Sequence, residues 1–247
     1  MAEATTLAAW LDFAEKLPPI ALSILDEAQI PETPGGAFDP KVMAAAMLMR
    51  TVSNFRGAVV LARVRQVVEA RVLTRCCIEN TFYLAELHAN GHAFVKKMYN
   101  DLRKSHTTLS ELVLSDGSML DVAVKERLKA QLRKINRGAP PPKFLNITGL
   151  VRGGLLAKSE GFYNLLSQDA AHPTLKSLNR YVRRFSEREL GLDPDPVVND
   201  SELSQTVNWA CMGLIGACVV FNESIGGTPA GQALLAIADQ WQALGEM

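Results

Sequence analysis

Three charged side chains recur every four residues in the apolar segment 54–87, at Arg71, Arg75 and Glu79. In a helix this spacing projects them from one side, over an arc of about 80°. Apolar residues flank this stripe on both sides. The stripe is therefore either a solvated face or a partly buried Arg/Glu network, and a buried network needs matched partners because unpaired charge is costly to bury.

A second polar group lies in the segment 160–175, where Tyr163, Ser167 and His172 gather near the end of an expected helix. His172 precedes Pro173, so it could cap the next helix, or it could exchange protons near neutral pH or bind a carboxylate or phosphate. We hypothesise that the two segments meet in a polar pocket between helices. Its members are Arg71, Arg75, Glu79, Tyr163, Ser167 and His172.

Two rows of basic residues are candidate anion-binding surfaces for a phosphate-containing ligand or a nucleic acid. The first row is Lys125, Lys129, Arg133 and Arg137, and the second is Lys176, Arg180, Arg183 and Arg184. Neither row has aromatic residues interleaved at a spacing suited to base stacking. Solvated helix faces are therefore the alternative interpretation.

The patterns FRGA, EARxLxRxxIENxFYL and YxxLSxxxAHPTL resemble an uncharacterised family of bacterial helical proteins, catalogued only as a domain of unknown function. The resemblance covers approximately residues 45–185 and includes all six pocket candidates. It implies an all-helical fold in which the two segments face each other, sometimes encoded near mobile elements or phage defence genes. It implies no known activity.

A distant relationship to the HEPN superfamily of helical ribonucleases and toxins is a further possibility. That superfamily carries an arginine followed by four to six residues and a histidine. None of the four histidines of this chain has an arginine at that distance, and the nearest pair, Arg103 and His106, is too close. This difference argues against ribonuclease activity.

Other signatures of catalysis or cofactor binding are missing from the sequence. It contains no Walker loop, GxGxxG strand-helix turn, HExxH or GxSxG motif. The four cysteines lie in apolar segments without a CxxC or Cys/His array, which is typical of reduced cysteines that fill a core. We expect neither a metal nor a cofactor.

Apolar residues recur at three- and four-residue spacing almost throughout, and sustained alternation is nearly absent, which predicts an all-α bundle of roughly eight to ten helices. Pro18-Pro19 should divide the first 30 residues into two helices. Asp39-Pro40 should start a long helical region that breaks near 54–57 or 64–67 and ends at Gly91.

Further helices are expected after Gly91, separated by turns. Their expected ranges are 92–114, 119–137, 159–167, 173–185, 200–225 and 228–244, with caps at Ser159 and at Asp200 with Ser201 and a loop over 186–199. The prolines of the connector 138–144 could divide the molecule, so we expect one domain over 1–247 with a possible subdivision near 138–148.

Charge is unevenly distributed in a chain of zero net charge. Residues 91–188 carry 18 basic and 8 acidic side chains, whereas residues 189–247 carry none and 8. The two regions could pair within the molecule, or the basic region could bind an anion. The N-terminus resembles no targeting sequence, and the apolar run 209–221 is too short for a membrane span, so we expect a cytoplasmic protein.

These observations leave three functional hypotheses. The first is a helical binding or regulatory protein that uses the polar pocket. The second is an enzyme or toxin acting on nucleotides or RNA, with His172 as acid/base and Arg75 as a phosphate clamp. The third is a scaffold that self-associates through the apolar segment 207–225 and the last helix.

Overall fold

The regular apolar spacing of the sequence produces an all-α protein. The computed structural model describes residues 6–30, 34–116, 121–146, 160–170, 174–186 and 189–246. Seven α-helices in these ranges have more than ten residues, slightly fewer than the eight to ten helices expected, and α1 and α8 are shorter. The α-helices are α1 (Leu7–Glu15), α2 (Leu17–Glu27), α3 (Pro40–Arg63), α4 (Val67–Ser115), α5 (Val122–Asn136), α7 (Glu160–Ala170), α8 (Leu175–Leu178), α9 (Asp200–Ser224) and α10 (Ala233–Glu246).

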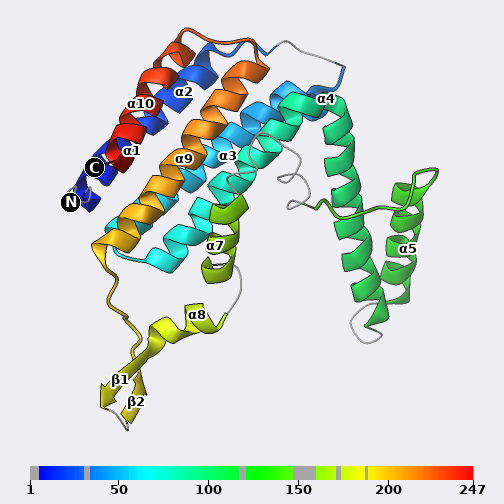
Figure 1. Cartoon of the computed structure of the whole chain (residues 1–247). Helices are drawn as coiled ribbons and strands as arrows, with labels where there is room; N and C mark the ends of the chain where they lie inside the picture. Colours follow the sequence, from blue (N-terminus) through cyan, green and yellow to red (C-terminus); the bar gives the residue numbers. More distant parts are fainter. Residues whose placement is uncertain are drawn as a thin grey trace.

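Three long helices, α3, α9 and the first half of α4, form the centre of the bundle, and α1, α2 and α10 pack beside α9 (Figure 1). Glycines allow α4 and α9 to approach closely. A Cβ atom on Gly213 would lie 3.1 Å from Cβ of Cys77, and Thr81 donates a hydrogen bond to the Gly213 carbonyl at 2.8 Å. The apolar core therefore runs along α9, where Leu203, Leu214 and Phe221 are fully buried.

Helix boundaries follow local signals in the sequence. Pro18 and Pro19 lie in the first turn of α2 and separate it from α1, as expected. Asp39 caps α3 by accepting a hydrogen bond from the Lys41 amide at 2.8 Å. The cap of α9 was wrongly predicted, because the Asn199 side chain accepts from the Glu202 amide and Asp200 is already helical.

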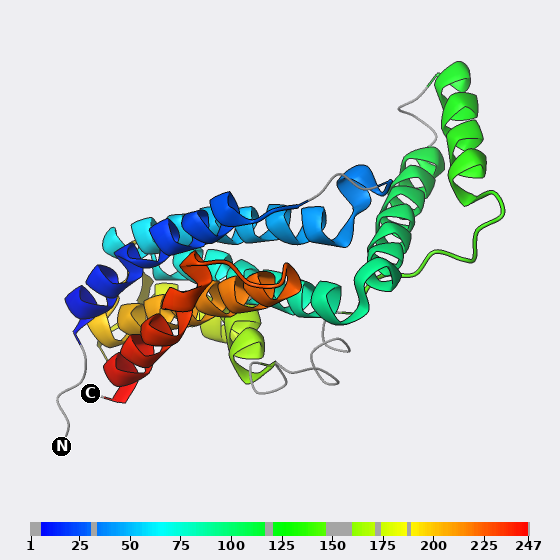
Figure 2. The same cartoon turned by 90° about the horizontal axis from the view of Figure 1, so that it is seen from above.

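Two backbone breaks set the direction of the long helices. The chain turns between α3 and α4 at Arg65, which has a positive φ of 64°, so the second of the two expected break positions is correct. At Gly91, with φ 47° and ψ −126°, α4 bends sharply. Residues 92–146, here called the arm, comprise the rest of α4, α5 and the following connector, and project from the bundle (Figure 2).

The helix expected over 173–185 was wrong in its second half. After α8 and a 3₁₀ turn, η3 (Asn179–Tyr181), the chain forms an antiparallel hairpin of β1 (Val182–Ser186) and β2 (Glu189–Leu192). β2 lies in the segment expected to be a loop. Every residue of β1 is exposed, so no buried helical face forms there, and the β-branched and aromatic Val182 and Phe185 suit a strand.

Helix α9 is long and apolar enough to cross a membrane by length and composition, and no other helix in the described ranges is. However, 67% of its most apolar window is buried inside the protein. α9 is therefore the core helix of a soluble bundle, as the sequence predicted for residues 209–221.

Candidate functional site

Helix α7 docks on α4 through an apolar cluster beside the predicted polar pocket. Tyr163 and Leu166 are buried against Ile78, Phe82 and Trp209. The Phe82 and Tyr163 rings meet edge to face, with centroids 5.8 Å apart. This packing fixes α7 at the turns of α4 that carry Arg75 and Glu79.

Arg75 is the centre of a hydrogen-bonded network between α4 and α7. Its Nε donates to Ser167 Oγ at 2.9 Å and its Nη2 to the Tyr163 hydroxyl at 2.6 Å. Nη2 also lies 3.2 Å from Glu79 Oε2, and the guanidinium lies over the Tyr163 ring. The structure therefore brings together four of the six residues assigned to the pocket, Arg75, Glu79, Tyr163 and Ser167.

The network is closed by its own members. Tyr163 donates weakly to Glu79 Oε2 at 3.5 Å, and Ser167 donates to the Tyr163 carbonyl at 2.8 Å. Burial and then the charge of Glu79 raise the pKa of Tyr163, while Arg75 opposes the rise, so the hydroxyl stays protonated and donates. The four side chains are thus in direct contact with one another.

Arg71 belongs to a different cluster. Its Nε donates to Thr206 Oγ1 at 3.2 Å and its Nη1 lies 2.9 Å from Glu202 Oε1, both on α9. Each four-residue step rotates a side chain by about 40°, so Arg71 and Glu79 at the ends of the stripe face different neighbours. The structure thus places Arg71 at the α4–α9 contact, and His172 lies outside the described residues.

A groove between α3 and α4, here called the α3–α4 groove, opens beside the network and has a volume of about 540 Å³. Its apolar wall comes from Ala37, Val42, Met43, Ala46, Met47 and Met98, and its polar side chains are Arg50, Glu79, Asn80 and Tyr83. Glu79 therefore belongs to both the groove and the Arg75 network.

The polar side chains of the groove differ in the hydrogen bonds and ion pairs that they make. Asn80 Nδ2 donates to Thr51 Oγ1 at 3.1 Å, and burial, followed by the charge of Glu79, raises the pKa of Tyr83 to about 12. Arg50 is exposed and, within the described ranges, makes no hydrogen bond or ion pair. Arg50, Asn80 and Tyr83 were not predicted as site residues from the sequence, although Met43, Met47 and Arg50 are spaced along one side of a helix.

The first basic row lies on the arm. Lys125, Lys129 and Arg133 are in α5, and Arg137 follows at its end in an extended conformation. Lys129 pairs with Glu126 of the same helix at 2.9 Å. The row is therefore a largely exposed helix face.

The second basic row does not exist as a helical stripe. Lys176 lies in α8 and Arg180 in η3, whereas Arg183 and Arg184 are neighbours on β1 and alternate between its two faces. Arg180 forms an ion pair with Glu202, and Arg183 lies 3.6 Å from Asp193. Acidic residues of the C-terminal region thus pair with this part of the basic region.

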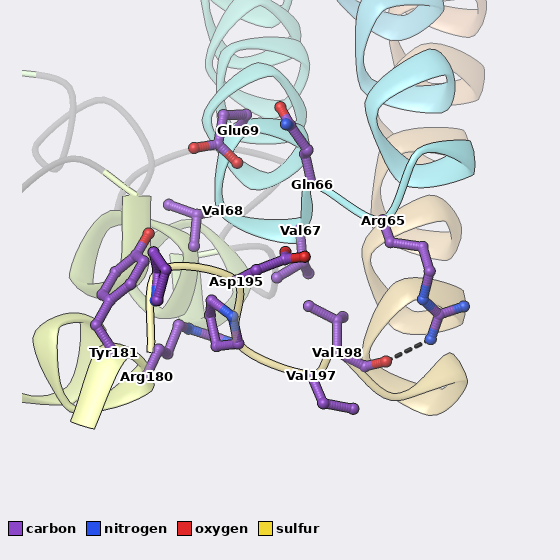
Figure 3. A pocket seen from close by; sticks show the side chains of 12 residues that line it. Arg65, Gln66, Val67, Val68, Glu69, Arg180, Tyr181, Asp195, Val197 and Val198 are labelled. Atoms are coloured by element: carbon purple, nitrogen blue, oxygen red, sulfur yellow. Dashed lines mark hydrogen bonds between the residues drawn. The ribbon is translucent and has the colours of Figure 1, made fainter. Parts of the chain in front are cut away.

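A small pocket of about 190 Å³ lies at the turn before α4 (Figure 3). Residues 65–69, Arg180, Tyr181 and the segment 194–198 line it. The Arg65 guanidinium donates to the Val198 carbonyl and pairs with Asp200, so it connects the turn before α4 to the start of α9. Since Arg180 is held by Glu202, the cations here already have protein partners.

Three of the four cysteines are core residues. Cys77, Cys211 and Cys218 are buried, and burial raises the pKa of each thiol, so they remain protonated. Cys76 is partly exposed, with its pKa raised mainly by burial and then by Glu79. In the ranges that the structure describes, no cluster of three or more His, Cys, Asp or Glu side chains could hold a metal ion.

Comparison with curated proteins gave no match, and comparison with solved structures gave none either. A family match covers residues 41–189, which include α3, α4, α5, α7 and β1. The Arg75 network, the arm and all the residues of the α3–α4 groove except Ala37 lie within this range. The chain therefore belongs to DUF5677, a family of unknown function.

Proposed function

We propose that the protein is a binding or regulatory protein that holds a small, partly apolar molecule in the α3–α4 groove. The observation that carries this proposal is the double position of Glu79, which lines the groove and also contacts Arg75 and Tyr163. A volume of about 540 Å³ is within the range of small-molecule sites.

The lining favours a ligand with an apolar body and a polar end. Met43, Met47 and Met98 supply a flexible, polarisable wall that adapts to different apolar shapes. Arg50 offers donors to an acidic or carbonyl group of the ligand, and the Glu79 carboxylate offers acceptors to an amine or hydroxyl. The ligand end therefore carries both an acceptor and a donor.

The same geometry provides a route to regulation. A ligand donor that engages Glu79 competes with its contact to Tyr163 of α7 and with its ion pair to Arg75, the residue that also binds Tyr163 and Ser167 of α7. Ligand binding and α7 docking are then coupled in free energy, and each changes the other. A binding protein with this coupling reports occupancy of the groove through the position of α7.

Native mass spectrometry of the purified full-length chain tests the groove. Ala46→Trp fills it, whereas Ala93→Trp adds the same side chain on an exposed face of α4 away from it. A small molecule that co-purifies, or that raises the Tm in a metabolite screen, should be retained by Ala93→Trp and lost by Ala46→Trp. Equal binding by both variants contradicts the proposal.

The competing hypothesis is a nucleotide- or RNA-acting enzyme, supported by the cluster of Arg75, Tyr163 and Ser167 in the segments that precede His172. His172→Ala separates the two functions. Loss of RNA cleavage or of toxicity with folding retained supports the enzyme, and an unchanged phenotype supports the binding protein.

We further propose a cytoplasmic setting in bacteria, with an association with phage defence or mobile elements. The burial of α9 supports the first point and the family resemblance of the sequence supports the second.

Self-association of the chain is a further hypothesis. Because most of α9 is buried inside the bundle, self-association would involve α10 rather than α9. Light scattering over a range of concentrations tests it.

A further inference from the structure

A second pocket lies on the arm, away from the α3–α4 groove, with a volume of about 470 Å³. Lys97 and Asn100 of α4 form one side, and residues 140–146 of the connector form the other. The connector is attached to α4 by the Leu145 amide, which donates to Asp101 Oδ1 at 2.6 Å. The pocket is therefore formed before any ligand binds.

Behind this pocket lies a buried cation with neutral partners. Arg103 is only 2% exposed and donates to Asn100 Oδ1 at 3.0 Å, Asn136 Oδ1 at 2.9 Å and the Pro140 carbonyl at 3.3 Å. Its Nε has no hydrogen-bond partner within the described residues. A buried charge without a carboxylate is unusual because its desolvation is not offset by an opposite charge.

The positive potential of Arg103 acts on the pocket, because two of its acceptors, Asn100 and Pro140, line it. Lys97 and Lys143 add two ammonium groups at the rim. Across the whole arm, residues 92–146 carry eleven basic and five acidic side chains. The net charge around this pocket is therefore positive, although the Asp101 carboxylate that holds Leu145 reduces it.

Apart from Asn100 and Asn146, the remaining lining is apolar. Phe144 is 59% exposed, and Pro140 and Pro141 lie beside it in the pocket. An exposed aromatic ring is a stacking surface for a nucleic-acid base, and the Lys104 ammonium already lies 5.7 Å from this ring. An aromatic surface and ammonium groups thus lie within one small pocket.

We propose that this pocket binds a nucleoside monophosphate, with the base on Phe144 and the phosphate between Lys97 and Lys143. The volume accommodates one nucleotide rather than a strand, which favours a mononucleotide over RNA. This pocket is separate from the α3–α4 groove, and we propose it as a binding site rather than an active site.

Isothermal titration of the full chain with AMP tests the proposal, with adenosine and inorganic phosphate as partial ligands. Both Phe144→Ala and the double variant Lys97→Gln/Lys143→Gln should weaken AMP binding about tenfold or more. Lys129→Gln/Arg133→Gln removes the same charge from exposed positions on α5 and should change the affinity less than about twofold.

The expected pattern is that AMP binds more tightly than either partial ligand. Three results overturn the proposal: no heat of binding with AMP at millimolar concentration, equal weakening by the control variant, or binding of an RNA oligonucleotide but not of AMP. Because all the substituted side chains are exposed, circular dichroism should show an unchanged fold for every variant.

Discussion

Arg75 makes more side-chain contacts between α4 and α7 than a solvated stripe would require. It donates hydrogen bonds to Ser167 and Tyr163 and forms an ion pair with Glu79, so this one side chain contacts three others. Hydrogen bonds to a charged group contribute about 1.5–3 kcal/mol each at most, and the terms are not additive in a network. The role of this residue is therefore measurable as stability before any ligand is known.

Arg75→Ala should lower the free energy of unfolding by about 1–3 kcal/mol, because the Tyr163 hydroxyl and Glu79 lose their shared partner. Urea unfolding followed by circular dichroism measures the change. Arg56→Ala, at an exposed position of α3, is the matched control and should stay within about 0.5 kcal/mol of wild type. Equal effects would show that the network contributes nothing specific.

Tyr83 gives a prediction about pH. Burial raises its pKa from 10.0 to about 12 in the folded protein, so the protonated form is favoured by folding. The stability that results is fully present below pH 10 and is lost as the pH rises through about 12. Absorbance at the tyrosinate band should show a transition near pH 12 that Tyr83→Phe removes; a Tyr83 transition near pH 10 would contradict the burial described here.

At the scale of elements, α7 depends on a few apolar contacts. Leu166 is fully buried against α4, whereas its neighbour Leu165 is 45% exposed. Leu166→Ala should cost about 2–4 kcal/mol, and Leu165→Ala less than about 1 kcal/mol. Hydrogen exchange over residues 160–170 should accelerate in the first variant alone if α7 docks as described.

The close approach of α4 and α9 gives a second element-scale prediction. Gly213→Ala places a methyl group 3.1 Å from Cys77 Cβ and 3.3 Å from backbone atoms of α4, which cannot move aside easily. We expect a loss of about 1–3 kcal/mol. Gly161→Ala in α7 meets open space and should be neutral or slightly stabilising, so thermal unfolding of both variants separates crowding from helix propensity.

Elements defined by local signals were predictable from the sequence. The cap at Asp39 and the breaks at Pro18 and Gly91 depend on residues within one turn of the boundary. The β1–β2 hairpin was not predictable, because its strands bury no face that would leave a period in the sequence. The candidate site was predictable only in part. The four-residue spacing of Arg75 and Glu79 predicted that they share one helix face, but Arg50 lies on α3, and only the packing of α3 against α4 brings it beside Glu79.

Over the whole molecule, the basic residues of the sequence are found in two different surroundings: some form ion pairs with acidic residues of α9, and others lie on the arm. Acidic residues at the start of α9 pair with Arg180 of the basic region and also with Arg65 and Arg71, which precede that region. The arm projects from the bundle, and the ion pair seen on α5 is internal to that helix. The positive field of the arm is therefore directed at solvent and at the pocket beside Phe144.

Glu202 tests this view of the whole molecule, because it joins α4, η3 and α9 through Arg71 and Arg180. Glu202→Gln removes the carboxylate that Arg71 and Arg180 share and should cost about 1.5–3 kcal/mol. Asp200→Asn removes the same charge two residues earlier from a carboxylate that is 68% exposed, and should cost less than about 1 kcal/mol. Urea unfolding of the two variants at low and high salt distinguishes a buried ion-pair junction from general charge neutralisation. General charge neutralisation predicts that both variants lose a similar free energy of unfolding and that high salt reduces both losses, whereas a buried junction predicts a larger loss for Glu202→Gln.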